Sequence, residues 1–189
     1  MALEARTVYF DSPGSENTEA VLQIAKKRAE ELGIKTIVVA STKGNTAVKA
    51  MDVFQGYRVI MVSHVTGFSE PNVQEFTPEN RKIVESKGGT IITAAHAFAG
   101  LSRAMRLKHN MYLLGEIVAD TLRIFGQGAK VACEIALMAV DSGLVPSGED
   151  VIAIGGTGSG ADTALVVKAA NTHRFFDLRV KEILCKPHF

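Results

Sequence analysis

The segment Thr36–Met51, TIVVASTKGNTAVKAM, constrains the fold most strongly, because its character changes twice along its length. It starts with the β-branched run Ile37–Val39, which is typical of a strand buried on both faces in a parallel sheet. A turn rich in hydroxyl groups follows, and a helix-like segment resumes at Ala47. The first amides of a helix have no intrahelical acceptor, and the helix dipole favours negative charge there. The segment therefore predicts an anion site between a strand and a helix.

The turn in this segment is a candidate phosphate cradle. It offers hydroxyl groups, one cation, and a glycine that permits close approach of the backbone. An ordinary helix N-cap after a strand, with no ligand, is the alternative that these residues leave open. The turn is not a Walker A loop, because the pattern G-x-x-x-x-G-K-[ST] is absent. The candidate binding residues are Ser41, Thr42, Lys43, Gly44, Asn45 and Thr46.

Composition predicts one globular domain that spans residues 1–189, with 47% hydrophobic and 22% charged residues. The net charge of +1 argues against nucleic acid as a main partner. No apolar run approaches the ~20 residues of a membrane span. The segment Met1–Phe10 carries an acid early and has no secretory apolar region, so we expect a cytoplasmic protein. Cys133 and Cys185 form no CxxC motif, which favours reduced, packed thiols.

Strands and helices alternate along the chain, which predicts parallel strands joined by right-handed crossovers. Polar side chains follow three of the predicted strands, and we expect them to gather at one edge of the sheet, where open α/β sheets bind ligands. His64 and His96 are candidate proton donors there, because imidazole titrates near neutral pH. A hydrogen-bonded structural role is the alternative for each. The predicted strands are 8–10 at an edge, 36–40, 58–62, 90–93, 151–154 and 164–167, and the predicted helices are 17–32, a helix that begins at Pro78, 112–125 and 128–142.

Three further segments leave alternatives open. The irregular loop 66–76 could fold over the strand ends as a lid, or could be a plain surface loop. The basic segment 97–110 could attract an acidic ligand, although a solvated face is favoured. In the apolar helix 128–142, Glu134 could be a buried acid at the ligand edge. We favour an exposed stripe with Lys130 and Asp141, which would hold an ordinary helical ion pair.

A second glycine-rich loop follows the predicted strand 151–154. Gly156, Gly158 and Ala161 formally match G-x-G-x-x-[GA], but residues 164–167 look like a strand, so a dinucleotide-binding fold is rejected. The loop is predicted to join two antiparallel strands and to present amides, Thr157 and Asp162 beside the first cradle. The alternating segment Phe175–Cys185 could add an edge strand and could pair across a dimer, which makes a homo-oligomer a candidate state.

Five motifs in order resemble standalone prokaryotic proteins of the pyruvate kinase C-terminal domain-like family. They are YF…PG…NT, VVAST.GNTA, VSH..GF, TLR.FGQG.KV..EIALMA.D and IGGTG.GADTAL. The resemblance as a whole covers nearly the entire chain, from Tyr9 to Pro187. The resemblance implies a three-layer α/β/α sandwich with a mostly parallel mixed sheet whose last core strand is antiparallel. It also implies a phosphorylated regulator at a Ser/Thr-rich loop similar to Ser41–Thr46. Because the catalytic barrel of pyruvate kinase has no counterpart in this sequence, kinase chemistry is not implied.

Some standalone relatives in this family are associated with flavin mononucleotide (FMN), so the resemblance implies a flavin-binding protein. If the protein is an enzyme, the resemblance implies an FMN-dependent oxidoreductase. The turn 41–46 would hold the phosphate, while the flavin would carry the redox chemistry. A non-catalytic sensor of a phosphorylated metabolite or nucleotide is the alternative. A hydrolase with a metal held by His64 and His96 lacks a recognised ligand spacing, so no metal is predicted. The residues expected around the ribityl chain and ring are Asn17, Thr18, His64, Thr93, Gly155, Gly156, Thr157, Asp162 and Thr163.

Overall fold

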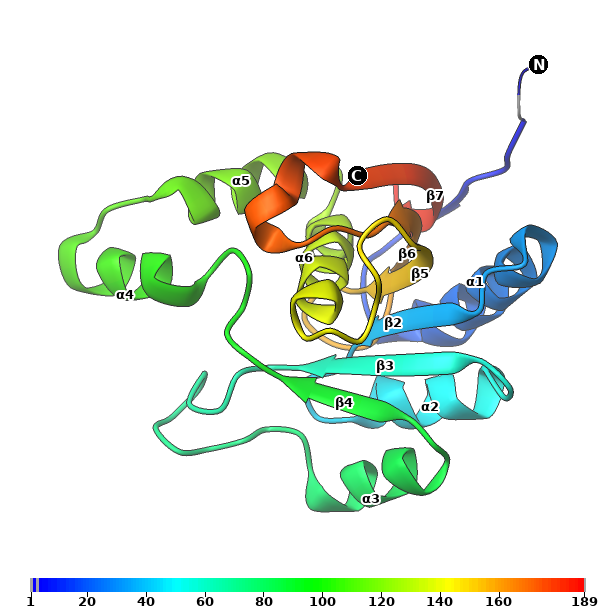
Figure 1. The fold of residues 1–189 in the computed structure, drawn as a ribbon, viewed down its shortest axis with the longest axis horizontal. Helices are drawn as coiled ribbons and strands as arrows, with labels where there is room; N and C mark the ends of the chain where they lie inside the picture. The colour runs from blue at the N-terminus through cyan, green and yellow to red at the C-terminus, as the bar shows by residue number, and fades with distance from the viewer. Residues whose placement is uncertain (1, 3, 189) are drawn as a thin grey trace.

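A computed structural model describes residue 2 and residues 4–188 as a seven-stranded mixed sheet with helices on both faces (Figure 1). The strand order is β1-β7-β6-β5-β2-β3-β4. The strands are β1 (Val8–Phe10), β2 (Thr36–Ala40), β3 (Arg58–Ser63), β4 (Thr90–Thr93), β5 (Asp150–Gly155), β6 (Thr163–Lys168) and β7 (Arg179–Pro187). The helices are α1 (Thr18–Leu32), α2 (Asn45–Val53), α3 (Pro78–Ser86), α4 (Gly100–His109), α5 (Leu114–Arg123) and α6 (Gln127–Asp141), with short 3-10 helices η1 (Ser15–Asn17) and η2 (Thr172–Asp177).

The strand directions confirm the predicted fold class. β2 pairs in parallel with β3 and β5, β3 with β4, and β1 with β7. β6 pairs antiparallel with both β5 and β7, so within the described residues it alone runs against the rest. The glycine-rich loop between β5 and β6 turns the chain back, which is the hairpin predicted from the sequence. The result is the predicted mixed sheet, which is mostly parallel and has β6 as its antiparallel strand.

Burial on both faces explains why β2 is a continuous β-branched run. Ile37 and Val39 enter the core under α1 and α2, together with Ala25 and Ala50. Val38 points the other way and packs in the core covered by α6. Successive side chains of a strand alternate between faces, so a strand covered on both sides needs an apolar residue at every position.

α6 covers its face of the sheet almost alone, and this position accounts for its composition. The positions from Ala132 to Val140 are all buried. A helix that is apolar around its whole circumference must be surrounded by other elements. α5 packs along α6 on its outer side, and α4 lies farther from the sheet (Figure 1). None of the described helices has the length and apolar character that a membrane crossing requires.

The C-terminal segment differs from the prediction. The first part of Phe175–Cys185 lies in η2, and β7 starts at Arg179. β7 is not an edge strand, because it lies between β6 and β1. The predicted edge strand Val8–Phe10 is β1 and takes the outer position instead. β1 pairs with β7 only at Cys185, Lys186 and Pro187, so the hypothesis that the segment 175–185 pairs across a dimer stays a prediction.

Candidate functional site

A cavity of about 570 Å³ lies at the carboxyl ends of β2, β3 and β5. This is within the size range of small-molecule sites, about 300–1,000 Å³. Its walls come from the turn after β2, the end of β3, the loop 66–76, α4, α6 and the glycine-rich loop. The predicted gathering of polar strand ends is thus confirmed for Ser41 and Thr42, for Ser63 and His64, and for His96.

The turn 41–46 forms one wall of the cavity. The Ser41 hydroxyl accepts a hydrogen bond from the Ala47 amide at 3.2 Å. The first helical amides, of Asn45 and Thr46, have no acceptor within a helix, so they remain for an acceptor outside it. Lys43 is exposed at the rim of the cavity. Ser41 thus satisfies one amide in the first turn of α2, whose N-cap residue is Gly44, and the amides of Asn45 and Thr46 beside it form a candidate anion site.

Gly44 serves packing rather than a close ligand contact. It has a φ of 97°, in the left-handed region that favours glycine. A Cβ atom at this position would lie 2.5 Å from the Asn80 Cβ and 2.8 Å from the Phe76 ring. Asn80 also donates to the Lys43 carbonyl at 2.9 Å and to the Asn45 side chain at 3.0 Å. The start of α3 therefore fixes the shape of the turn.

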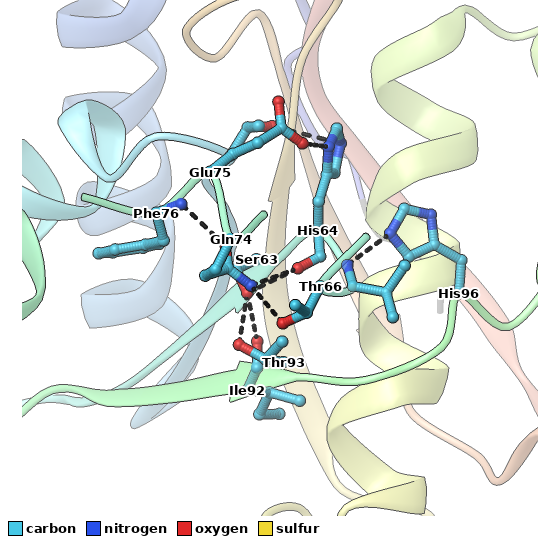
Figure 2. Close-up of polar contacts among 11 residues, drawn as sticks. Ser63, His64, Thr66, Gln74, Glu75, Phe76, Ile92, Thr93 and His96 are labelled. Carbon is cyan, nitrogen blue, oxygen red and sulfur yellow. Dashed lines mark hydrogen bonds and ion pairs between the residues drawn. The ribbon is translucent and has the colours of Figure 1, made fainter. Parts of the chain in front are cut away.

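His64 is held between two side chains in the cavity wall. Its Nδ1 lies 2.8 Å from a carboxylate oxygen of Glu75 (Figure 2). Its Nε2 lies 3.3 Å from the Thr42 hydroxyl. An ionised carboxylate can only accept, so Nδ1 carries the hydrogen atom that points at Glu75. The Nε2 of the neutral ring then accepts from Thr42. His64 is therefore oriented with a proton acceptor toward the cavity.

The loop 66–76 contributes aromatic and acidic groups to the cavity, as the lid hypothesis requires. The ring centroid of Phe68 lies 4.2 Å from that of His64 and 5.2 Å from that of His96. The Arg103 guanidinium lies over the ring of Phe68, 4.5 Å from its centroid. Cations and rings at this distance attract each other. The basic segment 97–110 thus places Arg103 at the cavity, whereas the other residues of α4 do not line it and Arg106 pairs with Glu116 of α5.

His96 is a hydrogen-bond acceptor in this structure. Burial lowers the pKa of His96, and the neighbouring His64, Lys130 and Arg103 lower it further against the opposing effect of Glu134. The neutral ring accepts a hydrogen bond from the Val65 amide at 3.4 Å (Figure 2). Of the two predicted histidines, His64 therefore carries the geometry of a proton carrier, and His96 carries that of a structural support.

The interpretation of Lys130 and Glu134 as an exposed stripe is wrong. Both side chains are buried, they form an ion pair one turn apart, and both line the cavity. Glu134 also accepts from the Phe98 amide at 3.0 Å. Of the three residues, only Asp141 is exposed as predicted, and it accepts hydrogen bonds from Thr172 and Asn171. The signal was present in the sequence, because a helix with no polar face must bury the few charges that it has.

Several predicted site residues do not line the cavity and instead form hydrogen bonds with the backbone of the glycine-rich loop. Asp162 is fully buried and accepts from the amides of Gly14 at 3.2 Å and Thr157 at 3.0 Å, and from the Thr163 hydroxyl at 2.8 Å. The Thr18 hydroxyl accepts from the Ala161 amide at 3.0 Å. These bonds fix the loop against the start of α1. Of the predicted residues, the described lining does not include Asn17, Thr18, Gly44, Thr93, Gly155, Thr157, Asp162 or Thr163.

The remaining predicted residues do line the cavity, together with groups that were not among the candidate site residues. Gly156 faces it with Gly158, Ser159 and Gly160 from the same loop. The additional side chains come from elements far apart in the chain, and four of them lie within motifs quoted above, Phe68 in VSH..GF and Arg123, Gln127 and Lys130 in TLR.FGQG.KV. The full set of additional side chains is Phe68, Glu75, Arg103, Arg123, Gln127 and Lys130. Among the described residues, no group of His, Cys, Asp and Glu has an arrangement that could hold a metal ion.

Comparisons with known proteins place these observations in a family context. The family model described as "Pyruvate kinase, alpha/beta domain" matches residues 19–167. Among solved structures, a pyruvate kinase from Cryptosporidium parvum is 16% identical over 80% of this chain, with a TM-score of 0.43. A structure of the Cryptosporidium parvum enzyme in complex with ADP is 17% identical, also over 80% of this chain, with a TM-score of 0.43. The chain spans 22% and 23% of the lengths of these enzymes.

Proposed function

This chain belongs to the pyruvate kinase alpha/beta domain family, and from that premise we propose that it binds a small phosphate-bearing ligand in the cavity. One observation carries the proposal: the N-terminus of α2, with the turn 41–46 before it, opens into a cavity that also contains Lys43 and Arg103. Backbone amides at a helix N-terminus and nearby cations are the groups that bind phosphate in proteins.

The phosphate is assigned to the α2 end of the cavity. There it meets the amides of Asn45 and Thr46, the hydroxyl of Thr46 and the charge of Lys43. The glycine-rich loop faces this wall, and its residues Gly158 to Gly160 offer backbone groups to the rest of the ligand. Buried Asp162 and Thr18 hold that loop in place, so the opposite wall is preorganised.

FMN is the phosphate ester that we assign first to this cavity. Its planar ring fits a site that presents the edges and faces of Phe68, His64 and His96, and the Arg103 guanidinium can lie against a π system. When bound, the flavin supplies hydride and electron transfer. The chain would orient the ring and exclude water. An FMN-dependent oxidoreductase is the enzymatic form of this proposal.

A non-catalytic sensor of a phosphorylated metabolite or nucleotide is the second candidate. It uses the same cradle and the same aromatic cluster, because a nucleotide base also stacks on aromatic rings. It differs in the outcome of binding: a sensor changes affinity or shape, and no electron transfer follows. The two candidates therefore share the phosphate site and differ in the rest of the ligand.

The test begins with the visible absorption spectrum of freshly purified protein, followed by denaturation and identification of what is released. Calorimetric titration with FMN and with riboflavin then isolates the contribution of the phosphate. We expect FMN to bind at least about tenfold more tightly, since a charged hydrogen bond contributes about 1.5–3 kcal/mol. Lys43→Ala should remove most of this difference. Lys49→Ala, which changes an exposed lysine on α2 outside the cavity lining, is the matched control and should leave the difference unchanged.

Equal affinities for FMN and riboflavin would show that the phosphate is not held, and would reject the cradle. A colourless protein that ignores flavins but binds sugar phosphates or nucleotides, with the same loss in Lys43→Ala, would favour the sensor. Absence of affinity for FMN, inorganic phosphate, sugar phosphates and nucleotides alike would overturn the proposed function.

A further inference from the structure

Thr42, His64 and Glu75 form a row of hydroxyl, imidazole and carboxylate in the cavity wall. Thr42 follows β2, His64 follows β3, and Glu75 lies at the end of the loop 66–76. The Thr42 hydroxyl lies 3.3 Å from Nε2 of His64. Nδ1 of the same ring lies 2.8 Å from the Glu75 carboxylate (Figure 2). A hydroxyl beside a base that is oriented by a third group is the arrangement of an activated nucleophile. It is recognised by geometry, not by position in the sequence.

Hydrogen bonds within the loop 66–76 fix the position of Glu75, the carboxylate of this row. The Gln74 side chain donates to the His64 carbonyl at 3.0 Å and accepts from the Phe76 amide at 2.8 Å (Figure 2). These bonds fix the backbone on either side of Glu75. Phe68 covers one side of the His64 ring. The imidazole therefore has one orientation, with Nδ1–H bonded to Glu75 and Nε2 facing Thr42.

The position of the row relative to the anion site indicates which chemistry it serves. Thr42 lies in the same turn as the free amides at the start of α2, and Lys43 is its neighbour in sequence. Positive groups at this place stabilise negative charge that develops on a group under attack. The contact of 3.3 Å is slightly longer than the ideal reach of a base, as is common before a ligand is bound. Cations from α4 and α6 add to the same field, which favours a phosphoryl group over a neutral acyl group.

We propose that Thr42 is a nucleophile that cleaves phosphate monoesters bound at the cradle, with His64 as general base and Glu75 as a positioning residue. This inference rests on the proposed binding of a phosphate ester, because the ester must first bind, and it makes FMN a substrate that is hydrolysed to riboflavin rather than a redox cofactor. The Thr42 oxygen attacks phosphorus while Nε2 of His64 takes the hydroxyl proton. The bond from phosphorus to the ester oxygen breaks, and His64 returns the proton to the departing alcohol. The product at this stage is phosphothreonine at position 42.

Water completes the reaction. His64 takes a proton from a water molecule, the oxygen of that water attacks phosphorus, and the bond to the Thr42 oxygen breaks. His64 then returns the proton to Thr42. The net change is a phosphate monoester and water converted to an alcohol and inorganic phosphate, with no oxidation or reduction. Glu75 does not exchange a proton in either step and acts by holding the tautomer of His64.

The test uses p-nitrophenyl phosphate as the substrate and mass spectrometry of the rapidly quenched protein. We expect release of p-nitrophenol and a phosphoryl group on the peptide that contains Thr42. Thr42→Val should lower turnover by at least about a thousandfold and abolish the adduct, while Thr42→Ser should restore both in part. Glu75→Gln should lower kcat by about 10- to 100-fold with little change in KM, as a misoriented base would. Thr121→Val, on α5 outside the cavity, is the matched control.

Binding of inorganic phosphate and FMN is measured on the same samples, so a failure of ligand binding can be told apart from a failure of catalysis by Thr42. Binding without p-nitrophenol release or adduct would overturn the nucleophile and leave the proposed function in place. An adduct on Ser41, or turnover unchanged in Thr42→Val, would also overturn it. If the wild-type protein binds neither ligand and releases no p-nitrophenol, the proposed function and this inference fail together.

Discussion

Lys130 and Glu134 form an ion pair within α6 whose side chains are only 9% and 6% exposed. The second carboxylate oxygen of Glu134 accepts from the Phe98 amide at 3.0 Å. Each charge is thus compensated by a partner, as a buried charge must be. The pair also joins two parts of the molecule, because Phe98 belongs to the segment between β4 and α4.

Removal of one member of this pair should destabilise the fold strongly. Lys130→Met leaves the Glu134 carboxylate buried without its cation, and we expect a loss of about 3–5 kcal/mol in the free energy of unfolding. The double variant Lys130→Met/Glu134→Gln removes both charges and keeps an acceptor for the Phe98 amide, so its loss should be smaller than that of Lys130→Met. Urea denaturation of the single and double variants measures the coupling. Losses that simply add would contradict a direct pair.

Gly44 is predicted to be irreplaceable for two separate reasons. Gly44→Ala places a side chain on a residue with a φ of 97° and brings its Cβ to 2.5 Å from that of Asn80. Left-handed backbone costs about 1–2 kcal/mol, and overpacking adds about 1–3 kcal/mol. Gly56→Ala is the matched control, because Gly56 has a φ of 81° with open space around it. It should lose only the backbone contribution.

Thermal or urea denaturation compares the two glycine variants directly. We expect Gly44→Ala to lose at least about 1 kcal/mol more than Gly56→Ala. It should also weaken phosphate binding, because the turn 41–46 must shift to admit the new methyl group. Equal losses in the two variants would mean that Asn80 and Phe76 move away at little cost, and that α3 does not fix the turn.

The sequence predicted those parts of the fold that depend on local patterns. β2 and β3 are apolar at nearly every position, Thr77 caps α3 with Pro78 behind it, and Gly126 separates α5 from α6. Each of these follows from burial or from backbone chemistry that a few neighbouring residues decide. The alternation of strands and helices predicted the parallel strands, the loop after β5 predicted the antiparallel pair, and the family resemblance implied the same arrangement.

The candidate site was predicted at the turn 41–46, at His64 and His96 after two strands, and at Gly156 in the glycine-rich loop. Each of these positions follows a predicted strand, so the sequence pattern reveals it. Phe68, Glu75 and Arg103 reach the cavity through tertiary packing, and nothing in their neighbouring residues reveals this. Asp162 was expected to face a ligand, but the amides that need its carboxylate belong to Gly14 and Thr157. A buried aspartate near glycines serves the loop backbone as readily as it serves a ligand.

Arg28 joins α1 to β7 through a bidentate contact with Glu182, with nitrogen–oxygen distances of 2.8 Å for both hydrogen bonds. The hydrogen bonds that Arg28 donates to the carboxylates of Glu182 and then Glu31 raise its pKa above the ordinary value. Lysine cannot reproduce the planar fork, so Arg28→Lys should lose about 1–2 kcal/mol in the free energy of unfolding. Arg81→Lys, in the exposed pair with Glu85 on α3, is the control and should change it by less than about 0.5 kcal/mol. Equal losses in urea denaturation would contradict a special role for the fork.

His96 should make the stability of the protein depend on pH in the acidic range. Burial lowers the pKa of His96 below the ordinary value of 6.5, so below that pH the unfolded chain binds a proton that the folded chain resists. Stability then falls as the pH drops from 6.5 toward the folded pKa, and it is fully present above 6.5. The charged groups that face the ring are Glu134, which opposes the shift, and His64, Lys130 and Arg103, which enhance it.

His96→Gln tests this dependence, because glutamine can still accept from the Val65 amide but does not titrate. Free energies of unfolding from urea denaturation are compared at about pH 7.5 and about pH 5.5, on either side of an ordinary imidazole pKa. The wild-type protein should lose more stability between these conditions than His96→Gln does. Parallel losses would show that His96 takes up its proton equally well in both states. A larger loss in His96→Gln would mean that the folded protein favours the imidazolium, with Glu134 outweighing burial.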